Sequence, residues 1–467
     1  MKKILICAVM LCAAVFFSVP AAAKKPVTGH EKGGSPASEM DESTKLTESE
    51  NLLHKGIELL KKEQYDEAVK AFDSSIALNP SQSVAWMFRA YANYAAGKYE
   101  AALGDFDQVI SIDPKNEKAY AGRADVFTAM KNYEKAIEDF STVISLTPDD
   151  PHAYAGRGIL YLQTRDYAKA VHDLTAALTD PDIDVRAKAY VYTALGVAQT
   201  ELKQDKAALE AFEAAIVAAP DYDAVYLERG MFYSKRDDNK KALEDFSKVV
   251  ELKPEDAEGY MYRAFAYNDL GEPKKAFADF DKAVELAPKS DRVYRSRGSA
   301  YMKAKDFKAA LKDYKKAAKL NPDLAGTHSG LSAAYLGVND ISNAKKSITR
   351  ALELDPKDTM MYFDYAEVML IAGETAKAEK AVTDGRALAK DDDEIVVGTY
   401  LDCVVRSVLG SDTAKCFAEF SEVMKKDFKH PWFTGFFEDW VKRAKLTEAQ
   451  KKFLRDITDL LNTKKRE

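Results

Sequence analysis

Small and large apolar residues recur along the chain with a fixed spacing of 34 residues, broken by one step of 38. One alanine marks each period, and a large apolar residue follows it four positions later, which places both on one face of a helix. The alanines are Ala68, Ala102, Ala136, Ala170, Ala208, Ala242, Ala276, Ala310, Ala344 and Ala378. The large residues are Phe72, Phe106, Phe140, Leu174, Phe212, Phe246, Phe280, Tyr314, Ile348 and Val382.

A second pair of positions repeats in register with the first. A ring stands sixteen residues before each alanine from the second period on, at Trp86, Tyr120, Tyr154, Tyr192, Tyr226, Tyr260, Tyr294, His328 and Tyr362. A small residue follows four positions later, at Ala90, Ala124, Gly158, Gly196, Gly230, Ala264, Gly298, Ser332 and Ala366. Small side chains let two helices approach closely, while the rings fill the gaps between neighbouring helix pairs. Prolines close most periods, as expected where a helix ends.

This pattern resembles the tetratricopeptide repeat, a helix-turn-helix unit of 34 residues. The resemblance implies an all-α fold: a right-handed helix-turn-helix solenoid of about eleven units with a C-terminal helical cap, in which each unit contacts its sequence neighbours. We place the array at 49–424 and the cap at 425–467. The units start near Ser49, Ser83, Glu117, Pro151, Ala189, Asp223, Ala257, Asp291, Ala325, Thr359 and Val397.

Two insertions interrupt the 34-residue spacing, and two further helices are predicted at the end of the chain. Four-residue insertions at 180–184 and 390–394 are expected in loops between repeats. Residues 431–443 and 446–461 look like amphipathic helices, the second opened by a capping box from Thr447 to Gln450. Their apolar residues predict a cap over the end of the core, with a ligand box as the alternative. These residues are Trp432, Phe436, Phe437, Trp440, Phe453, Ile457 and Leu461.

The first 48 residues differ in composition from the array. Residues 1–23 combine two lysines, a mostly apolar stretch and a small-residue end at Ala23, which predicts a cleaved secretory signal peptide of bacterial type. An uncleaved anchor, or a lipoprotein signal at Cys12, are the alternatives. Residues 24–48 hold almost no large apolar residue and predict a disordered linker. We therefore expect a periplasmic or secreted protein with no membrane insertion after signal cleavage.

Charge and motifs exclude several functions. The net charge is -7 and no basic stripe is present, so nucleic acid is not an expected partner. The six histidines show no metal-ligand spacing, and no phosphate-binding loop, nucleophile elbow or metalloprotease motif occurs. We expect no enzyme activity, no cofactor and no metal.

Six of the units contain both an arginine and an aspartate at fixed positions. Arginine stands at position 7 and aspartate at position 23 of the same unit, and the units without one also lack the other. Pairing inside each unit leaves none of these charges alone, so we predict structural ion pairs with bidentate geometry. An arginine track for anionic ligands is the alternative. The pairs are Arg89 with Asp105, Arg123 with Asp139, Arg157 with Asp173, Arg229 with Asp245, Arg263 with Asp279, and Arg297 with Asp313.

Function follows from the resemblance as well. In this family the first helix of each unit lines the concave face and holds an extended peptide or a partner helix, through positions 2, 5, 6, 9, 12 and 13. We call these positions the first-helix face. Here they predict partner-binding residues Met87, Phe88, Tyr91, Tyr94, Gly122, Gly156, Leu227, Met231, Met261, Tyr262, Phe265 and Asn268. The glycines suggest a stretch that a partner backbone approaches closely. Of the family's carboxylate-clamp positions, only Lys118 matches.

Cys403 and Cys416 are the only cysteines after the predicted signal peptide. They fall on opposite helices of the eleventh unit, so an oxidising compartment favours a disulfide between them. Two buried free thiols are the alternative.

The sequence as a whole predicts a non-catalytic protein-protein interaction scaffold or adaptor of the bacterial cell envelope, with an unidentified protein or peptide partner. A periplasmic chaperone-like holder of exported polypeptides is the alternative.

Overall fold

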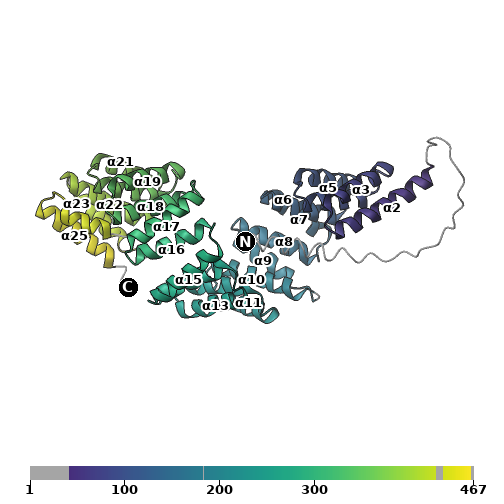
Figure 1. The fold of residues 1–467 in the computed structure, drawn as a ribbon, viewed down its shortest axis with the longest axis horizontal. Helices are drawn as coiled ribbons and strands as arrows, with labels where there is room; N and C mark the ends of the chain where they lie inside the picture. The colour runs from purple at the N-terminus through teal and green to yellow at the C-terminus, as the bar shows by residue number, and fades with distance from the viewer. Residues whose placement is uncertain (1–40, 182, 427–434, 464–467) are drawn as a thin grey trace. The chain divides into compact units, whose positions relative to one another are not determined.

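The computed structural model describes residues 41–181, 183–426 and 435–463, which form helices and connecting turns and contain no strand (Figure 1). The predicted leader and most of the predicted linker lie outside the described residues, as does Trp432. The chain divides after Lys235 into two compact units, so the boundary falls between the two helices of the sixth repeat.

The first unit contains the helices up to the sixth repeat. They are α2 (Glu42–Lys61), α3 (Tyr65–Leu78), α4 (Ser83–Ala95), α5 (Tyr99–Ile112), α6 (Glu117–Ala129), α7 (Tyr133–Leu146), α8 (Pro151–Gln163), α9 (Tyr167–Ala177), α10 (Val185–Glu201), α11 (Asp205–Ala218) and α12 (Asp223–Ser234).

The second unit contains the remaining repeats and the C-terminal helices. They are α13 (Asn239–Leu252), α14 (Ala257–Asp269), α15 (Pro273–Leu286), α16 (Asp291–Lys303), α17 (Phe307–Leu320), α18 (Ala325–Gly337), α19 (Ile341–Leu354), α20 (Thr359–Ile371), α21 (Thr375–Leu388), α22 (Asp392–Leu409), α23 (Ala414–Val423), α24 (Gly435–Arg443) and α25 (Glu448–Thr463).

The alanine ladder forms the contact between helices, as predicted. All ten alanines are 0% exposed, and the large residue that follows each of them is buried too. The small residues of the first helices face these side chains. A Cβ added at Gly196, for example, would lie 2.6 Å from the Phe212 ring. Since a larger residue would collide there, the recurring small residues are required for packing.

The predicted rings fix the connection between one repeat and the next. The Trp86 indole N–H donates to the Pro80 carbonyl at 2.9 Å, and the Tyr226 hydroxyl donates to the Pro220 carbonyl at 3.1 Å. The ring therefore satisfies a carbonyl in the loop that the closing proline forms.

The turn inside each repeat depends on one left-handed residue. Its φ is 61° at Lys131 and 76° at Gly97, and the equivalent residue is left-handed in each of the first ten repeats. This conformation ends the first helix, because it lets the Asn132 N–H reach the Phe127 carbonyl at 2.8 Å. The Asn132 side chain then caps α7 by accepting from the Lys135 N–H.

Two expectations about segments without helix were wrong in part. Helix α2 begins at Glu42, so residues 42–48 are helical and do not belong to the linker. The Asp41 side chain starts this helix early by accepting from the Thr44 N–H at 2.9 Å. The insertion near 180–184 lies in the loop between α9, which ends at Ala177, and α10, which begins at Val185, as expected. The insertion near 390–394 lies only partly in a loop, because α22 begins at Asp392 behind the N-cap Asp391.

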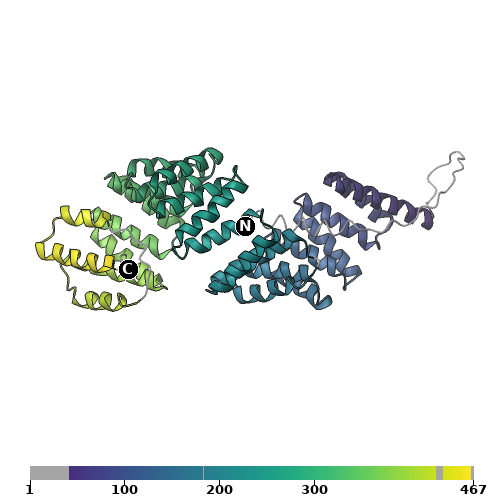
Figure 2. The same ribbon diagram turned by 90° about the horizontal axis from the view of Figure 1, so that it is seen from below.

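The C-terminal helices cover the end of the core, as predicted for a cap. Helix α25 packs against α22 and α24 (Figure 2), and the side chains of Phe437, Ile457 and Leu461 are fully buried. The predicted capping box is present, because the Gln450 N–H donates to Thr447 Oγ1 at 3.2 Å and the Thr447 N–H donates to Gln450 Oε1 at 2.9 Å.

Candidate partner-binding surface

The predicted arginine and aspartate pairs join the two helices of a repeat. Arg123 donates from Nε to Asp139 Oδ2 and from Nη2 to Asp139 Oδ1, both at 2.8 Å. The hydrogen bond to Asp139 raises the pKa of Arg123. Five pairs have this bidentate geometry: Arg89 with Asp105, Arg123 with Asp139, Arg157 with Asp173, Arg263 with Asp279, and Arg297 with Asp313. Arg229 and Asp245 belong to different compact units, so their pairing stays a prediction.

Three of these arginines also bind an aspartate of the preceding repeat, which the sequence analysis missed. Arg123 Nη1 donates to Asp107 Oδ1 at 2.5 Å, and Arg89 and Arg297 bind Asp73 and Asp281 in the same way. The signal was present in the sequence, because these aspartates stand two positions after position 23. Each of these guanidinium groups has two carboxylate partners inside the chain, which argues against an arginine track for anionic ligands.

The predicted partner-binding aromatic residues of α4 are partly covered by the chain itself. The ring of Phe88 lies 6.1 Å from that of Phe72, and the ring of Tyr91 lies 5.3 Å from that of Phe106. Tyr94 contacts Tyr99 at a centroid distance of 5.9 Å. The three predicted residues and Met87 are nevertheless only half-buried. They keep accessible apolar surface on the first-helix face, and their role in binding stays a prediction.

The two glycines predicted to admit a partner backbone lie against rings of the preceding repeat. A Cβ at Gly122 would lie 2.4 Å from the Phe106 ring, and one at Gly156 would lie 2.6 Å from the Phe140 ring. For the buried Gly122 this prediction was wrong, because its missing side chain serves packing between repeats. Gly156 is half-buried, so its contact with a partner stays a prediction.

The other predicted residues divide by exposure. Met261 is 2% exposed and its sulfur accepts from the Ser296 hydroxyl at 3.2 Å, so it does not belong to the accessible surface, contrary to the prediction. Tyr262 is half-buried and its hydroxyl accepts from Arg292 Nη2 at 2.7 Å. The half-buried residues that remain are Leu227 and Met231 in the first unit, and Phe265 and Asn268 in the second.

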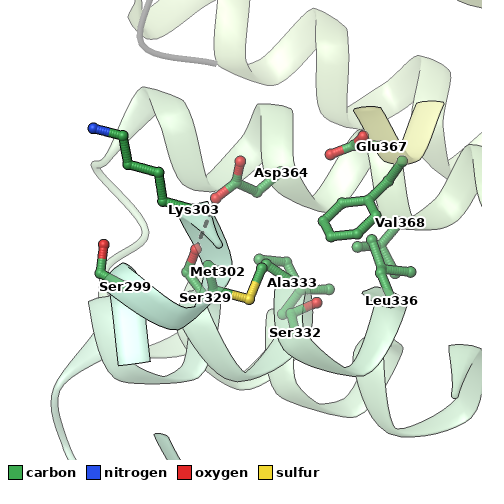
Figure 3. Close-up of a pocket in the computed structure, with 12 residues that line it drawn as sticks. Ser299, Met302, Lys303, Ser329, Ser332, Ala333, Leu336, Asp364, Glu367 and Val368 are labelled. Atoms are coloured by element: carbon green, nitrogen blue, oxygen red, sulfur yellow. Dashed lines mark hydrogen bonds between the residues drawn. The ribbon is translucent and has the colours of Figure 1, made fainter. Parts of the chain in front are cut away.

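A cavity of about 480 Å³ lies on the first-helix face of repeats eight to ten (Figure 3). It is formed by α16, α18 and α20, with Ile348 of α19, and Phe436 of α24 lines it from the C-terminal cap. Two acidic residues of α20, Asp364 and Glu367, line it as well. Sequence analysis missed both, although they stand at positions 6 and 9 of the tenth repeat.

Cys403 and Cys416 are buried free thiols, so the structure does not contain the predicted disulfide. Burial, and to a lesser extent the interaction with Cys416, raises the pKa of the Cys403 thiol. The alternative of two small buried apolar side chains describes this arrangement.

No helix among the described residues has the length and apolar composition to cross a membrane. In the same part of the chain, no group of three or more histidine, cysteine, aspartate or glutamate residues is arranged to hold a metal ion.

Family models match most of the repeats. A model described as tetratricopeptide repeat matches residues 53–117, 156–223, 227–291 and 330–392, more than half of the chain. Two further models with this description match residues 93–160 and 292–324. The chain belongs to the tetratricopeptide-repeat family. Membership supports a role as a protein-protein interaction scaffold, and families with this fold are generally non-catalytic.

Comparison with curated proteins finds no match. Among solved structures, the chain is similar to yeast Tom70, at 15% identity and a TM-score of 0.40, over 80% of this chain and 99% of that one. It is also similar to a tetratricopeptide repeat protein from Parabacteroides merdae, at 19% identity and a TM-score of 0.39, over 62% of this chain and 99% of that one. Likenesses of this size carry no argument about partner or location.

Proposed function

We propose that this tetratricopeptide-repeat protein is a non-catalytic scaffold of the bacterial cell envelope that holds a protein partner on its first-helix face. The proposed location rests on the leader pattern of residues 1–23, with its lysines, apolar stretch and small-residue end at Ala23. Residues 24–40 then connect the array to the cleavage site.

The assignment of the binding surface rests on the half-buried apolar side chains of α4. Phe88, Tyr91 and Tyr94 are large and lie close together, and intrachain contacts leave part of each ring accessible. Neighbouring aromatic rings of this kind are typical of binding hot spots. The buried arginine pairs hold the helices in register, so the surface is pre-organised.

Site-specific photo-crosslinking in the native cell tests this proposal. A photoreactive amino acid replaces Tyr94 on α4, and in a control chain it replaces Val217, which is 84% exposed on the second helix α11. We expect Tyr94 to crosslink to one or two fixed proteins and Val217 to crosslink to neither.

Three results would contradict the proposal. Crosslinks from Tyr94 to many unrelated exported polypeptides would indicate a chaperone-like holder. Equal crosslinking at Tyr94 and Val217 would contradict the assignment of the binding surface to α4. A mature protein that retains residues 1–23 and remains in the cytoplasm would remove the envelope location.

A further inference from the structure

The cavity on repeats eight to ten contains a carboxyl group without a partner. Glu367 is 6% exposed, and its Oε1 has no hydrogen-bond partner among the described residues. An isolated buried polar group of this kind destabilises a folded protein, so it calls for an explanation. Glu367 also lines the cavity, where a ligand would reach it (Figure 3).

The other charged groups of the cavity do not neutralise Glu367. Lys303 of α16 extends to the opposite side of the cavity in Figure 3, where its ammonium binds Asp269 at 2.7 Å. Asp364 stands three residues before Glu367 on the same helix and accepts from the Ser329 hydroxyl at 2.8 Å. Among the described residues, no cation binds Glu367, and the neighbouring Asp364 is a second acidic group at this end of the cavity.

Burial, and to a lesser extent the charge of Asp364, raise the pKa of Glu367 well above its usual value. Tyr400 of α22 is a further titratable group close to it, and its own pKa is raised mainly by burial. The remaining cavity residues of α18, α19 and α24 carry no charge. Burial in the cavity thus favours the protonated form of Glu367, whereas a cationic ligand would favour the ionised form.

The geometry points to a binding site for a basic side chain, arginine or lysine, of a partner polypeptide, with Glu367 and Asp364 as its anionic partners. This inference rests on the proposed scaffold function, because it names a feature that the partner would carry.

The shape and lining of the cavity agree with this ligand. Met302, Leu336 and Val368 offer apolar surface to the methylene groups of a basic side chain, and its charged end would lie at the two carboxyl groups. The volume of about 480 Å³ lies within the range of small-ligand pockets. A guanidinium matches a pair of carboxylates especially well, because its N–H donors form a planar fork.

Two short peptides test the inference on the full chain. One is acetyl-Ala-Ala-Arg-Ala-Ala-amide, and the other has citrulline in place of arginine, which keeps the shape and removes the charge. Methyl NMR of labelled methionine follows Met302 in the cavity, with Met130, the C-cap residue of α6 in the first unit, as an internal control. We expect a saturable shift of Met302 with the arginine peptide, and binding weaker by about tenfold or more with citrulline.

Matched variants identify the carboxyl group. Glu367→Gln is close in shape to the neutral acid and should weaken arginine binding several-fold, toward the citrulline level, whereas Glu379→Gln, on the exposed side of α21, should leave it unchanged. Binding to the unmodified chain should strengthen as the pH rises, by at most about tenfold per pH unit, because Glu367 must lose its proton. The Glu367→Gln chain should lack this pH dependence.

Equal binding of the two peptides, or no shift of Met302 with either, would overturn the inference. This comparison uses the unmodified chain, so it does not depend on the folding of a variant. A negative result here with retained crosslinks at Tyr94 would leave the scaffold function standing. Arginine binding without crosslinks at Tyr94 would support the cavity and contradict the assigned surface on α4.

Discussion

Removal of Asp139 should strongly destabilise the third repeat. In Asp139→Ala, Arg123 loses both bonds of its bidentate pair while its guanidinium remains between α6 and α7. The side chain of Asp139 is 7% exposed and that of Arg123 is 21% exposed, so the charge left behind is poorly solvated. Removal of one partner of a buried pair costs about 3 to 5 kcal/mol. Because Arg123 keeps Asp107, we expect the lower limit, about 3 kcal/mol.

Asp107 provides a control on the same guanidinium. Its side chain is 60% exposed, so the bond to Arg123 is an ion pair open to solvent and screened by salt. Asp107→Ala should cost less than about 1 kcal/mol. The two substitutions remove the same chemical group from the same arginine and differ in burial.

A double substitution separates the unpaired charge from other effects. The double variant Arg123→Leu with Asp139→Ala places leucine at position 7 and alanine at position 23 of the third repeat. The fifth repeat has the same two residue types there, as Leu195 and Ala211, and both are buried. Replacement of an ion pair by apolar residues is often neutral. We therefore expect the double variant to recover most of the stability that Asp139→Ala loses.

Hydrogen exchange of the α6 and α7 amides measures the effect locally, which suits a repeat array whose parts open separately. A loss of 3 kcal/mol corresponds to exchange faster by roughly 100-fold. Equal effects of Asp139→Ala and Asp107→Ala, or a double variant less stable than Asp139→Ala, would refute the reasoning.

Three further predictions concern packing, capping and pH. Gly122→Ala should cost about 1 to 3 kcal/mol because its Cβ would collide with Phe106, whereas Gly104→Ala, with open space around it, should stabilise by up to about 1 kcal/mol; urea denaturation compares them. Thr447→Ala should destabilise α25 by about 1 kcal/mol, seen as faster amide exchange confined to that helix, and unchanged exchange would exclude the capping role. Burial raises the pKa of Asp125 to about 7. The folded chain then holds a proton that the unfolded chain loses, so the stability present below pH 4 decreases as the pH rises through about 7. Asp125→Asn should therefore match the unmodified chain at pH 4 and exceed its stability at pH 8, by up to about 4 kcal/mol; equal stability of the two chains at both pH values would contradict this.

The fold was predictable because its contacts repeat. Each repeat packs mainly on its sequence neighbours, so the alanine at position 20 and the large residue after it report the same contact ten times. The arginine and aspartate pairs were predictable for the same reason, since units that lack one member also lack the other.

The partner-binding residues were harder to predict, because position in the repeat does not determine exposure. Gly122 and Met261 occupy first-helix positions, yet a ring of the preceding repeat fills the space at Gly122 and neighbouring helices bury Met261. The cavity at Glu367 depends on Phe436, 69 positions further along the chain, in a helix outside the repeat pattern. A contact of this kind leaves no periodic signal.

The central claim is that a partner lies on the first-helix face. Hydrogen exchange of the purified chain, with and without the protein crosslinked at Tyr94, tests it most directly. We predict slower exchange on the first helices, with α4 the most affected, and little change on α5 and α11. Protection confined to second helices, or spread evenly over both, would contradict the claim.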